Sequence, residues 1–294
     1  MELLRALGAL CEPPAEGHAA LAQAVGLERA PTAAEFADTF LFRLYPYASV
    51  YLDGEGMLGG EARDRVAGFW AALGLTPPAE PDHLAVLLAL HASLAEEEAG
   101  EADEARRTLL REARRALLWE HLLPWLPPYL AKAHEVAAGP YREWAALLRE
   151  ALLAEARALG LPGDPLPLHL REAPPLDPPA VAGGEAFLAQ LLAPVRSGLL
   201  LTRDDLARAA AALRLGLRPG ERRFALRGLL GQDAAGTLAW LAAEAEAWED
   251  RHTRDEARLG SIARFWRERA AAAAVVLAEA AEVARTSGQE VAHA

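Results

Sequence analysis

Hydrophobic residues recur along this chain every three to four positions, and no stretch alternates apolar and polar residues as a half-buried strand does. Proline and glycine separate the periodic stretches. The pattern predicts an all-α protein. In the first half we expect helices at about 33–52, 60–73, 81–98, 103–122, 125–137 and 140–159. In the second half we expect helices near 185–195, 203–214, 219–231, 233–250 and 255–285, with Thr202 as a helix N-cap.

The clearest boundary is a proline-rich stretch, because seven prolines fall between residues 162 and 179 and a helix cannot continue through them. We therefore predict a helical domain over 1–165 and a connector over 166–184. A C-terminal helical extension over 185–294 follows, and the sequence assigns it no role.

Composition indicates a protein that folds around an ordinary core. The chain has 294 residues, of which 52% are hydrophobic, and its single cysteine, Cys11, can form no internal disulfide. The N-terminus carries an acid at Glu2 and fits no signal peptide, and no uncharged apolar run reaches the roughly 18 residues of a membrane span. We expect a cytoplasmic protein without stable membrane insertion.

Charge is distributed unevenly between the two halves. Residues 1–165 carry 14 Lys and Arg against 25 Asp and Glu, a net charge of −11, whereas residues 166–294 carry 16 against 17, a net charge of −1. The acidic half repels nucleic acid and membrane phosphates, and it attracts a cationic partner such as a basic peptide.

Signals of catalysis are missing. The sequence contains no GxSxG, no GxxxxGK[ST], no GxGxxG after a strand and no CxxC. His134-Glu135 begins like a zinc-protease helix, but Ala138 stands where the second histidine is needed. His83 and His91 are too far apart for the usual chelate. We predict a protein that is not an enzyme and has no metal or cofactor.

One short motif combines acids with a histidine. Glu80-Pro81-Asp82-His83 precedes an apolar helical pattern, so the acid and the histidine are expected in the first helical turn, where an acid complements the helix dipole. These side chains then face a ligand instead of the core. An ordinary helix start, with Pro81 in the first turn, is the alternative interpretation.

Four segments resemble one family in order and spacing. They are FLFRLYPYASVYL at 40–52, GGE at 59–61, EPDHL at 80–84 and EHLLPWLP at 120–127. Together they are similar to the TorD/DmsD/NarJ family of chaperones for molybdenum redox enzymes, and the resemblance covers about residues 35–160. The EPDH motif is its most specific element.

The resemblance implies a TorD-like helical bundle that binds the apo catalytic subunit of a molybdopterin oxidoreductase or its twin-arginine leader, and assists cofactor insertion before export. It assigns leader binding to Tyr45, Glu80, Pro81, Asp82, His83, Leu84, His121 and Trp125. The Asp82 carboxylate is expected to pair with a leader arginine and His83 to bond peptide backbone. Leu84 and Tyr45 are expected to receive the apolar stretch of the leader.

Several alternatives stay open. The chain can be a dedicated assembly subunit of a nitrate-reductase-like complex that is never exported, and a homodimer is possible. Residues 201–230 contain two short helical patterns around a glycine, which resemble a helix-turn-helix regulator, although the acidic first half argues against DNA binding. Residues 221–227, ERRFALR, also resemble a twin-arginine leader placed deep inside the chain.

Overall fold

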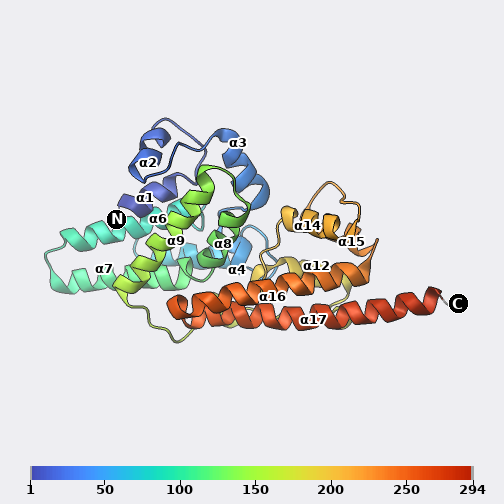
Figure 1. Ribbon diagram of the computed structural model, residues 1–294. Helices are drawn as coiled ribbons and strands as arrows, with labels where there is room; N and C mark the ends of the chain where they lie inside the picture. The colour runs from blue at the N-terminus through green and yellow to red at the C-terminus, as the bar shows by residue number, and fades with distance from the viewer. Residues whose placement is uncertain (1, 293–294) are drawn as a thin grey trace. The chain divides into compact units, whose positions relative to one another are not determined.

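Helices form all the regular structure in the part of the chain that the structure describes, residues 2–292 of a computed structural model (Figure 1). The one exception among these residues is an isolated antiparallel bridge between Tyr47 and His83. The prediction of an all-α fold is confirmed.

The chain divides into two compact units. Unit 1 contains residues 1–50 and 58–169, and unit 2 contains residues 51–57 and 170–294. The second boundary lies close to the predicted one at 165, but the segment 51–57 belongs to unit 2 although unit 1 surrounds it in the sequence.

Unit 1 is built from short and medium helices. They are α1 (Glu2–Ala9), α2 (His18–Ala24), α3 (Ala33–Phe36), the π-helical segment η1 (Ala37–Arg43), α4 (Ala48–Leu52, whose last two residues fall in unit 2), α5 (Gly60–Ala72), α6 (Leu84–Gly100), α7 (Glu104–Ala116), the π-helical segment η2 (Leu117–Leu122), α8 (Leu126–Val136) and α9 (Pro140–Leu159). A short helix, α10 (Leu168–Glu172), spans the boundary to unit 2.

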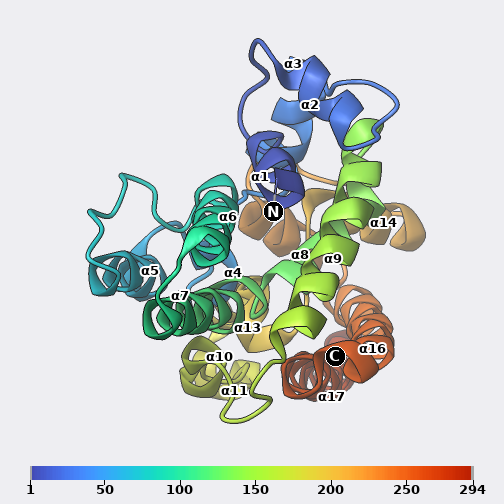
Figure 2. The same ribbon diagram turned by 90° about the vertical axis from the view of Figure 1, so that its left-hand side faces the viewer.

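Buried aromatic residues hold α1 in unit 1. The Trp144 indole N–H donates to the Leu7 carbonyl at 2.8 Å, and the Tyr141 hydroxyl donates to the Leu10 carbonyl at 3.0 Å. These bonds satisfy carbonyl groups at and just beyond the C-terminal end of α1, which the helix itself leaves unpaired. As a result α1 packs against α6 and α9 (Figure 2). The sequence analysis missed α1 because its seven-residue apolar pattern is too short to stand out.

Unit 2 consists of α11 (Pro179–Ala182), α12 (Gly184–Leu192), α13 (Pro194–Ser197), α14 (Arg203–Leu213), α15 (Arg222–Leu230), α16 (Ala234–Leu259) and α17 (Ser261–Ala292). The last two pack along each other as a long hairpin (Figures 1 and 2). Thr202 caps α14 as predicted, in a capping box with Asp205. At Gly198, with φ of +75°, a Cβ atom would lie 2.3 Å from the Ala270 nitrogen, so α13 approaches α17 more closely than a side chain allows.

Several predicted helices have different bounds. The expected helix 33–52 is interrupted at 44–47, where Pro46 prevents a continuous helix. The expected break after residue 250 is wrong, because α16 continues through the charged stretch 249–256, which contains no proline or glycine. The helix α2 was also missed.

The second part of the proline-rich segment, residues 173–177, is fastened to unit 2. Arg196 donates to the Pro175 carbonyl at 2.9 Å and pairs with Asp177 at 3.1 Å. Arg269 donates to the Ala173 carbonyl at 2.5 Å. These bonds fix residues 173–177 within unit 2, whereas the division between the units falls at 169/170, inside the predicted connector.

The helix-turn-helix alternative is not supported by the connection between α14 and α15. Residues 214–221 separate the two helices, whereas the DNA-binding motif has a turn of about 3–4 residues. The leader-like stretch 221–227 lies mostly in α15, with Ala225 and Leu226 buried in unit 2. It is a structural helix and not a free peptide.

None of the helices among the described residues has the length and apolar character that crossing a lipid bilayer requires.

The discontinuous make-up of unit 2 predicts how a nicked chain behaves. We expect that a cut at a protease site inserted between Gly183 and Gly184 leaves two fragments that still elute together in native size-exclusion chromatography. The N-terminal fragment retains 51–57 and 170–183, which belong to unit 2, and buried contacts inside a unit survive the loss of one peptide bond. The fragments should separate in denaturant. Separation under native conditions contradicts the division described above.

Candidate functional site

The site is built on two non-helical turns of unit 1 that bond to each other. The Leu84 N–H donates to the Pro46 carbonyl at 2.8 Å, and the Ala48 N–H donates to the Asp82 carbonyl at 3.1 Å. These bonds form the bridge between Tyr47 and His83. Backbone groups that are removed from water need such partners, so the turn before α4 and the turn before α6 stabilise each other.

The buried side chain of Asp82 stabilises these two turns. Its side chain is only 2% exposed, and its Oδ2 atom accepts the Ser49 backbone N–H at 3.1 Å. Ser49 in turn accepts the Gly59 N–H at its hydroxyl, at 3.1 Å. The sequence analysis placed Asp82 in the first turn of a helix facing a ligand. The structure places it before the helix, buried and already bonded, because α6 begins only at Leu84.

His83 is the N-cap of α6. Its Nδ1 atom accepts the Ala85 N–H at 3.2 Å, so the neutral ring carries its proton on Nε2. Its ring lies edge-on to Tyr47, with 4.8 Å between the centroids. Burial lowers the pKa of His83, although the negative charges of Glu80, Glu12 and Asp82 oppose the shift. The neutral form is the one that caps the helix.

Glu80 is the exposed acid of the motif. The Tyr47 hydroxyl donates to its Oε2 atom at 3.0 Å, which fixes the direction of the carboxylate and leaves its other oxygen facing solvent. Burial first, and then this bond to Glu80, raise the pKa of Tyr47 to about 12. The Tyr47 hydroxyl therefore stays protonated at neutral pH.

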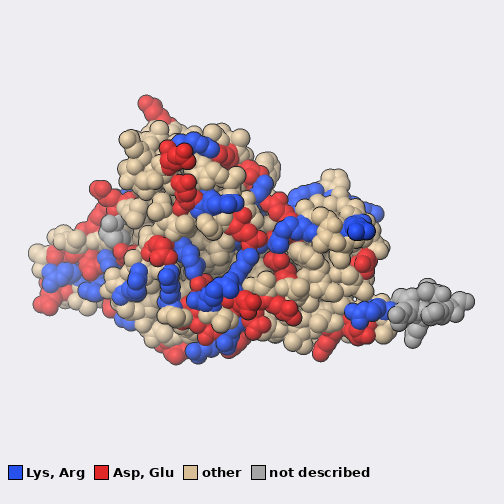
Figure 3. Space-filling model, viewed as in Figure 1, with Lys and Arg blue, Asp and Glu red and all other residues tan. Residues whose placement is uncertain are grey.

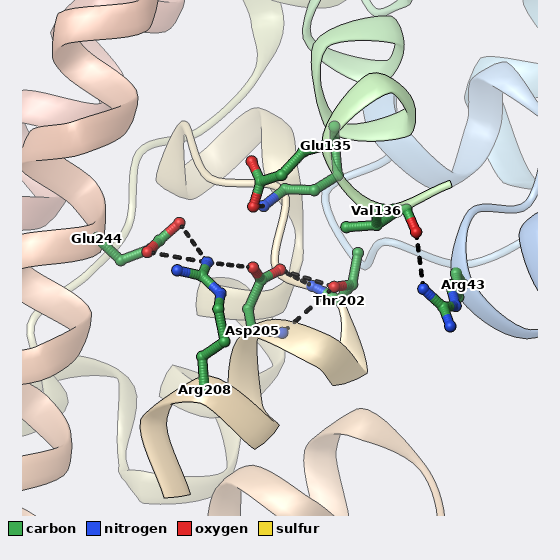
Figure 4. A network of polar contacts seen from close by, with 8 residues as sticks. Arg43, Glu135, Val136, Thr202, Asp205, Arg208 and Glu244 are labelled. Carbon is green, nitrogen blue, oxygen red and sulfur yellow. Dashed lines mark hydrogen bonds and ion pairs between the residues drawn. The ribbon is translucent and has the colours of Figure 1, made fainter. Parts of the chain in front are cut away.

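Next to this turn lies a group of exposed apolar side chains, here called the apolar strip. It consists of Leu41, Phe42 and Tyr45, which are 49%, 73% and 41% exposed. The strip covers the end of η1 and the residues that follow it. Arg43 holds this end in place, because it donates to the Val136 carbonyl at 2.8 Å (Figure 4). It also pairs with Asp38 at 3.1 Å. π-Helical turns of this kind are frequent at functional sites.

Three predicted site residues lie in the core. Leu84 and Trp125 have no exposed surface, and the Trp125 indole N–H donates to the His121 carbonyl at 2.9 Å. His121 is buried beside Phe69 and His169. Burial, with smaller effects of His169 and Arg65, lowers its pKa to about 3. These three residues support the fold and present no surface to a ligand.

The structure thus brings together five of the predicted residues: Tyr45, Glu80, Pro81, Asp82 and His83. Leu41 and Phe42 complete the surface and were not assigned to it, although they belong to the first segment of the resemblance. The described residues contain no group of three His, Cys, Asp or Glu that can hold a metal ion. A fixed carboxylate beside apolar rings is suited to binding a peptide with a cationic and an apolar part.

Part of the chain, including these residues, is similar to a known protein family. Residues 8–131 match the family described as the nitrate reductase delta subunit. Within these residues the chain is similar to the nitrate reductase delta subunit family. No curated protein is similar enough to the chain to serve as a relative.

The match supports, in general terms, a role in the assembly of a molybdoenzyme. The match includes the apolar strip and the whole turn from Glu80 to His83. The end of α8, all of α9 and the rest of the chain after residue 131 lie outside it.

The buried bond of Asp82 predicts a stability effect in this delta-family site. Replacing Asp82 with Ala leaves the Ser49 N–H without a partner, which should lower the free energy of unfolding by about 1–3 kcal/mol. Asp82→Asn keeps an acceptor oxygen and should cost less than half as much. Urea denaturation of both variants measures the difference. Equal losses would show that the Ser49 bond is not what Asp82 provides.

The buried imidazole of His121 predicts a pH dependence. Its pKa in the folded chain is about 3, below the value of about 6.5 in an unfolded chain. Between these values only the unfolded chain binds the proton, so stability falls as the pH decreases, by up to about 1.4 kcal/mol per pH unit. Urea midpoints between pH 7 and pH 5 should fall less steeply for His121→Gln than for the unchanged chain. His134→Gln, at an exposed histidine, is the control, and an unchanged slope in His121→Gln contradicts the prediction.

Proposed function

We propose that this chain is a cytoplasmic assembly chaperone that binds the apo catalytic subunit of a molybdopterin oxidoreductase through its twin-arginine leader. In this role it holds the client until the cofactor is inserted and only then releases it for export. The observation that carries the proposal is that exposed Glu80 is bonded to Tyr47, in the turn that contains Tyr45 and directly follows the rest of the apolar strip. All these residues lie within the match to the delta subunit family.

Glu80 is the carboxylate that we assign to a leader arginine. It is exposed and oriented by Tyr47, whereas the Asp82 carboxylate is buried and bonded to Ser49. An arginine can bind a carboxylate through two parallel N–H bonds, and such charge-assisted bonds are among the stronger ones in proteins. The proposal thus moves the arginine-binding role from Asp82 to its neighbour in the motif and makes Asp82 the residue that holds the turn in place.

The apolar strip supports the second half of the recognition. A leader carries an apolar stretch after its arginines, and Phe42 and Leu41 offer rings and methyl groups that are already exposed in the free chain. His83 adds a directional contact, since its Nε2–H can donate to a peptide carbonyl while Nδ1 caps α6. Tyr45 is the last residue of the strip and also lies in the turn at 44–47, so it contributes to both parts.

The charge of the first half supports rapid capture of a basic segment. Residues 1–165 carry a net charge of −11, and such a field increases the rate of encounter with a cationic peptide more than it slows dissociation.

A second candidate role follows from the name of the matched family. A delta-type subunit can act as a dedicated assembly factor for a nitrate-reductase-like complex that stays in the cytoplasm. The two roles differ in what they require of the client. If the chain still copurifies with a client that lacks its leader, the dedicated assembly role is supported. If the client without its leader no longer copurifies with the chain, the export role is supported.

The test uses matched pairs of exposed residues. We expect Glu80→Gln and Phe42→Ser each to weaken binding of a molybdoenzyme leader peptide by about tenfold, which corresponds to about 1.4 kcal/mol. The controls are Glu97→Gln and Leu109→Ser on α6 and α7, where Leu109 is 70% exposed, close to the 73% of Phe42. Isothermal titration calorimetry at constant ionic strength measures the affinities.

Three results would count against the proposed site. Loss of affinity in the controls equal to that in the two test variants would indicate a nonspecific effect. Unchanged affinity in Glu80→Gln would remove the arginine contact. A large loss in Asp82→Asn with normal stability would return the arginine-binding role to Asp82.

A further inference from the structure

The connection between α14 and α15 in unit 2 is held by side chains that hydrogen-bond to its backbone. Arg203 donates to the carbonyls of Arg218, at 3.2 Å, and of Gly220. Gln232 bonds both the N–H and the carbonyl of Gly216, at 2.8 Å and 2.7 Å. Two side chains from outside the loop therefore fix the backbone of residues 214–221 at both ends, while most of its own side chains remain exposed. We call residues 203–227 the arginine hairpin.

Some arginines of this hairpin are neutralised by the fold. Arg208 pairs with Asp205 at 2.5 Å and with Glu244 at 3.2 Å, and the same Asp205 completes the cap of α14 with Thr202 (Figure 4). Arg222 and Arg227 also have partners: Arg222 donates to the Leu201 carbonyl at 2.7 Å, and Arg227 pairs with Glu185. These groups serve the structure of unit 2.

Three other arginines have no carboxylate partner within the described residues. Arg214, Arg218 and Arg223 are all exposed. Arg218 is held in place without being neutralised, because its stem lies over Gly228 and its guanidinium carbon is 5.8 Å from the centre of the Phe224 ring. Phe224 itself is 44% exposed. The hairpin thus presents three exposed guanidinium groups without a carboxylate partner, one of them over an exposed aromatic ring.

The charge of this surface differs from that of the rest of the chain. Residues 203–227 contain seven arginines and three acids, a net charge of +4, whereas the whole chain carries −12. The remaining residues therefore carry −16. Figure 3 shows blue side chains around an uncharged surface over α14 and α15.

We propose that the arginine hairpin is a docking surface for a short acidic segment of a partner protein, with one apolar residue of that segment against Phe224. Arginine is the residue best suited to paired bonds with carboxylates, and a loop that is already fixed loses little entropy when a ligand binds. The aromatic ring adds contact area beside the charges. This surface lies outside the residues that match the delta subunit family, so the proposal is independent of leader binding.

The net charge of −16 elsewhere favours a short ligand over an extended one. A nucleic acid or an anionic membrane extends well beyond the hairpin and is repelled by the acidic remainder of the chain. An acidic peptide segment ends before that repulsion accumulates. The partner we infer is therefore a protein segment rich in Glu or Asp.

The experiment compares two triple variants of the full chain that change the net charge equally. The test variant carries Arg214→Gln, Arg218→Gln and Arg223→Gln, because Gln retains much of the side-chain stem but not the charge. The control carries Arg107→Gln, Arg111→Gln and Arg254→Gln, at exposed arginines on α7 and α16. The probe is a fluorescein-labelled peptide of sequence EEFEELEE, and its affinity is measured by anisotropy at physiological salt.

We expect the unchanged chain and the control to bind this peptide with equal affinity and the test variant to bind at least tenfold more weakly. Phe224→Ala should weaken binding of EEFEELEE but not of a peptide with serine in place of its apolar residues. Circular dichroism and thermal melting confirm that each variant is folded.

Absence of peptide binding to the unchanged chain, or equal weakening in the control, overturns the proposal. It is also overturned if a DNA duplex, or vesicles of equal parts phosphatidylserine and phosphatidylcholine, bind the hairpin more tightly than the peptide does. All of these results leave leader binding untouched, because Glu80 and the apolar strip are unchanged in every variant.

Discussion

The central constraint on unit 1 is that backbone N–H and carbonyl groups outside its helices need hydrogen-bond partners. At 44–47 and 80–83 the chain leaves helical geometry, and it does so where water is largely excluded. Each turn supplies the partners that the other needs, and Asp82 supplies the one acceptor that backbone alone does not. The starts of α4 and α6, the orientation of Tyr47 and the outward position of Glu80 all follow from this pairing. The few hydrogen bonds that stabilise these two turns also position the residues of the candidate site.

Local chemistry made much of the helical layout predictable. Pro140 begins α9 and Thr202 caps α14, because each acts on its own backbone within one turn. The features that sequence did not predict depend on distant partners. The helix α1 is held by Trp144 and Tyr141, more than a hundred residues away. Likewise, the polar stretch 249–256 remains helical because its apolar neighbours pack on α17, which polarity alone cannot indicate.

In the candidate site, too, some features were predictable from the sequence and others were not. The resemblance identified the turn from Glu80 to His83. It did not identify which carboxylate faces solvent, because the sequence of the motif is the same whether Glu80 or Asp82 is the buried acid. Leu84 and Phe42 are both large apolar residues beside the turn, yet Leu84 has no exposed surface and Phe42 is 73% exposed. The π-helical geometry of η1 determines this difference, and an extra residue per turn leaves no mark in the hydrophobic pattern.

The membership of residues 51–57 in unit 2 has a consequence for biosynthesis. A ribosome makes this segment first, then all of residues 58–169, and only afterwards the rest of unit 2. At about 5–20 residues per second, the segment waits roughly ten seconds for its partners. Throughout that time Tyr51 and Leu52, which are buried in the finished protein, have no unit 2 surface to cover them. The nascent chain therefore carries an unsatisfied apolar segment, a natural substrate for the general chaperones that attend translation.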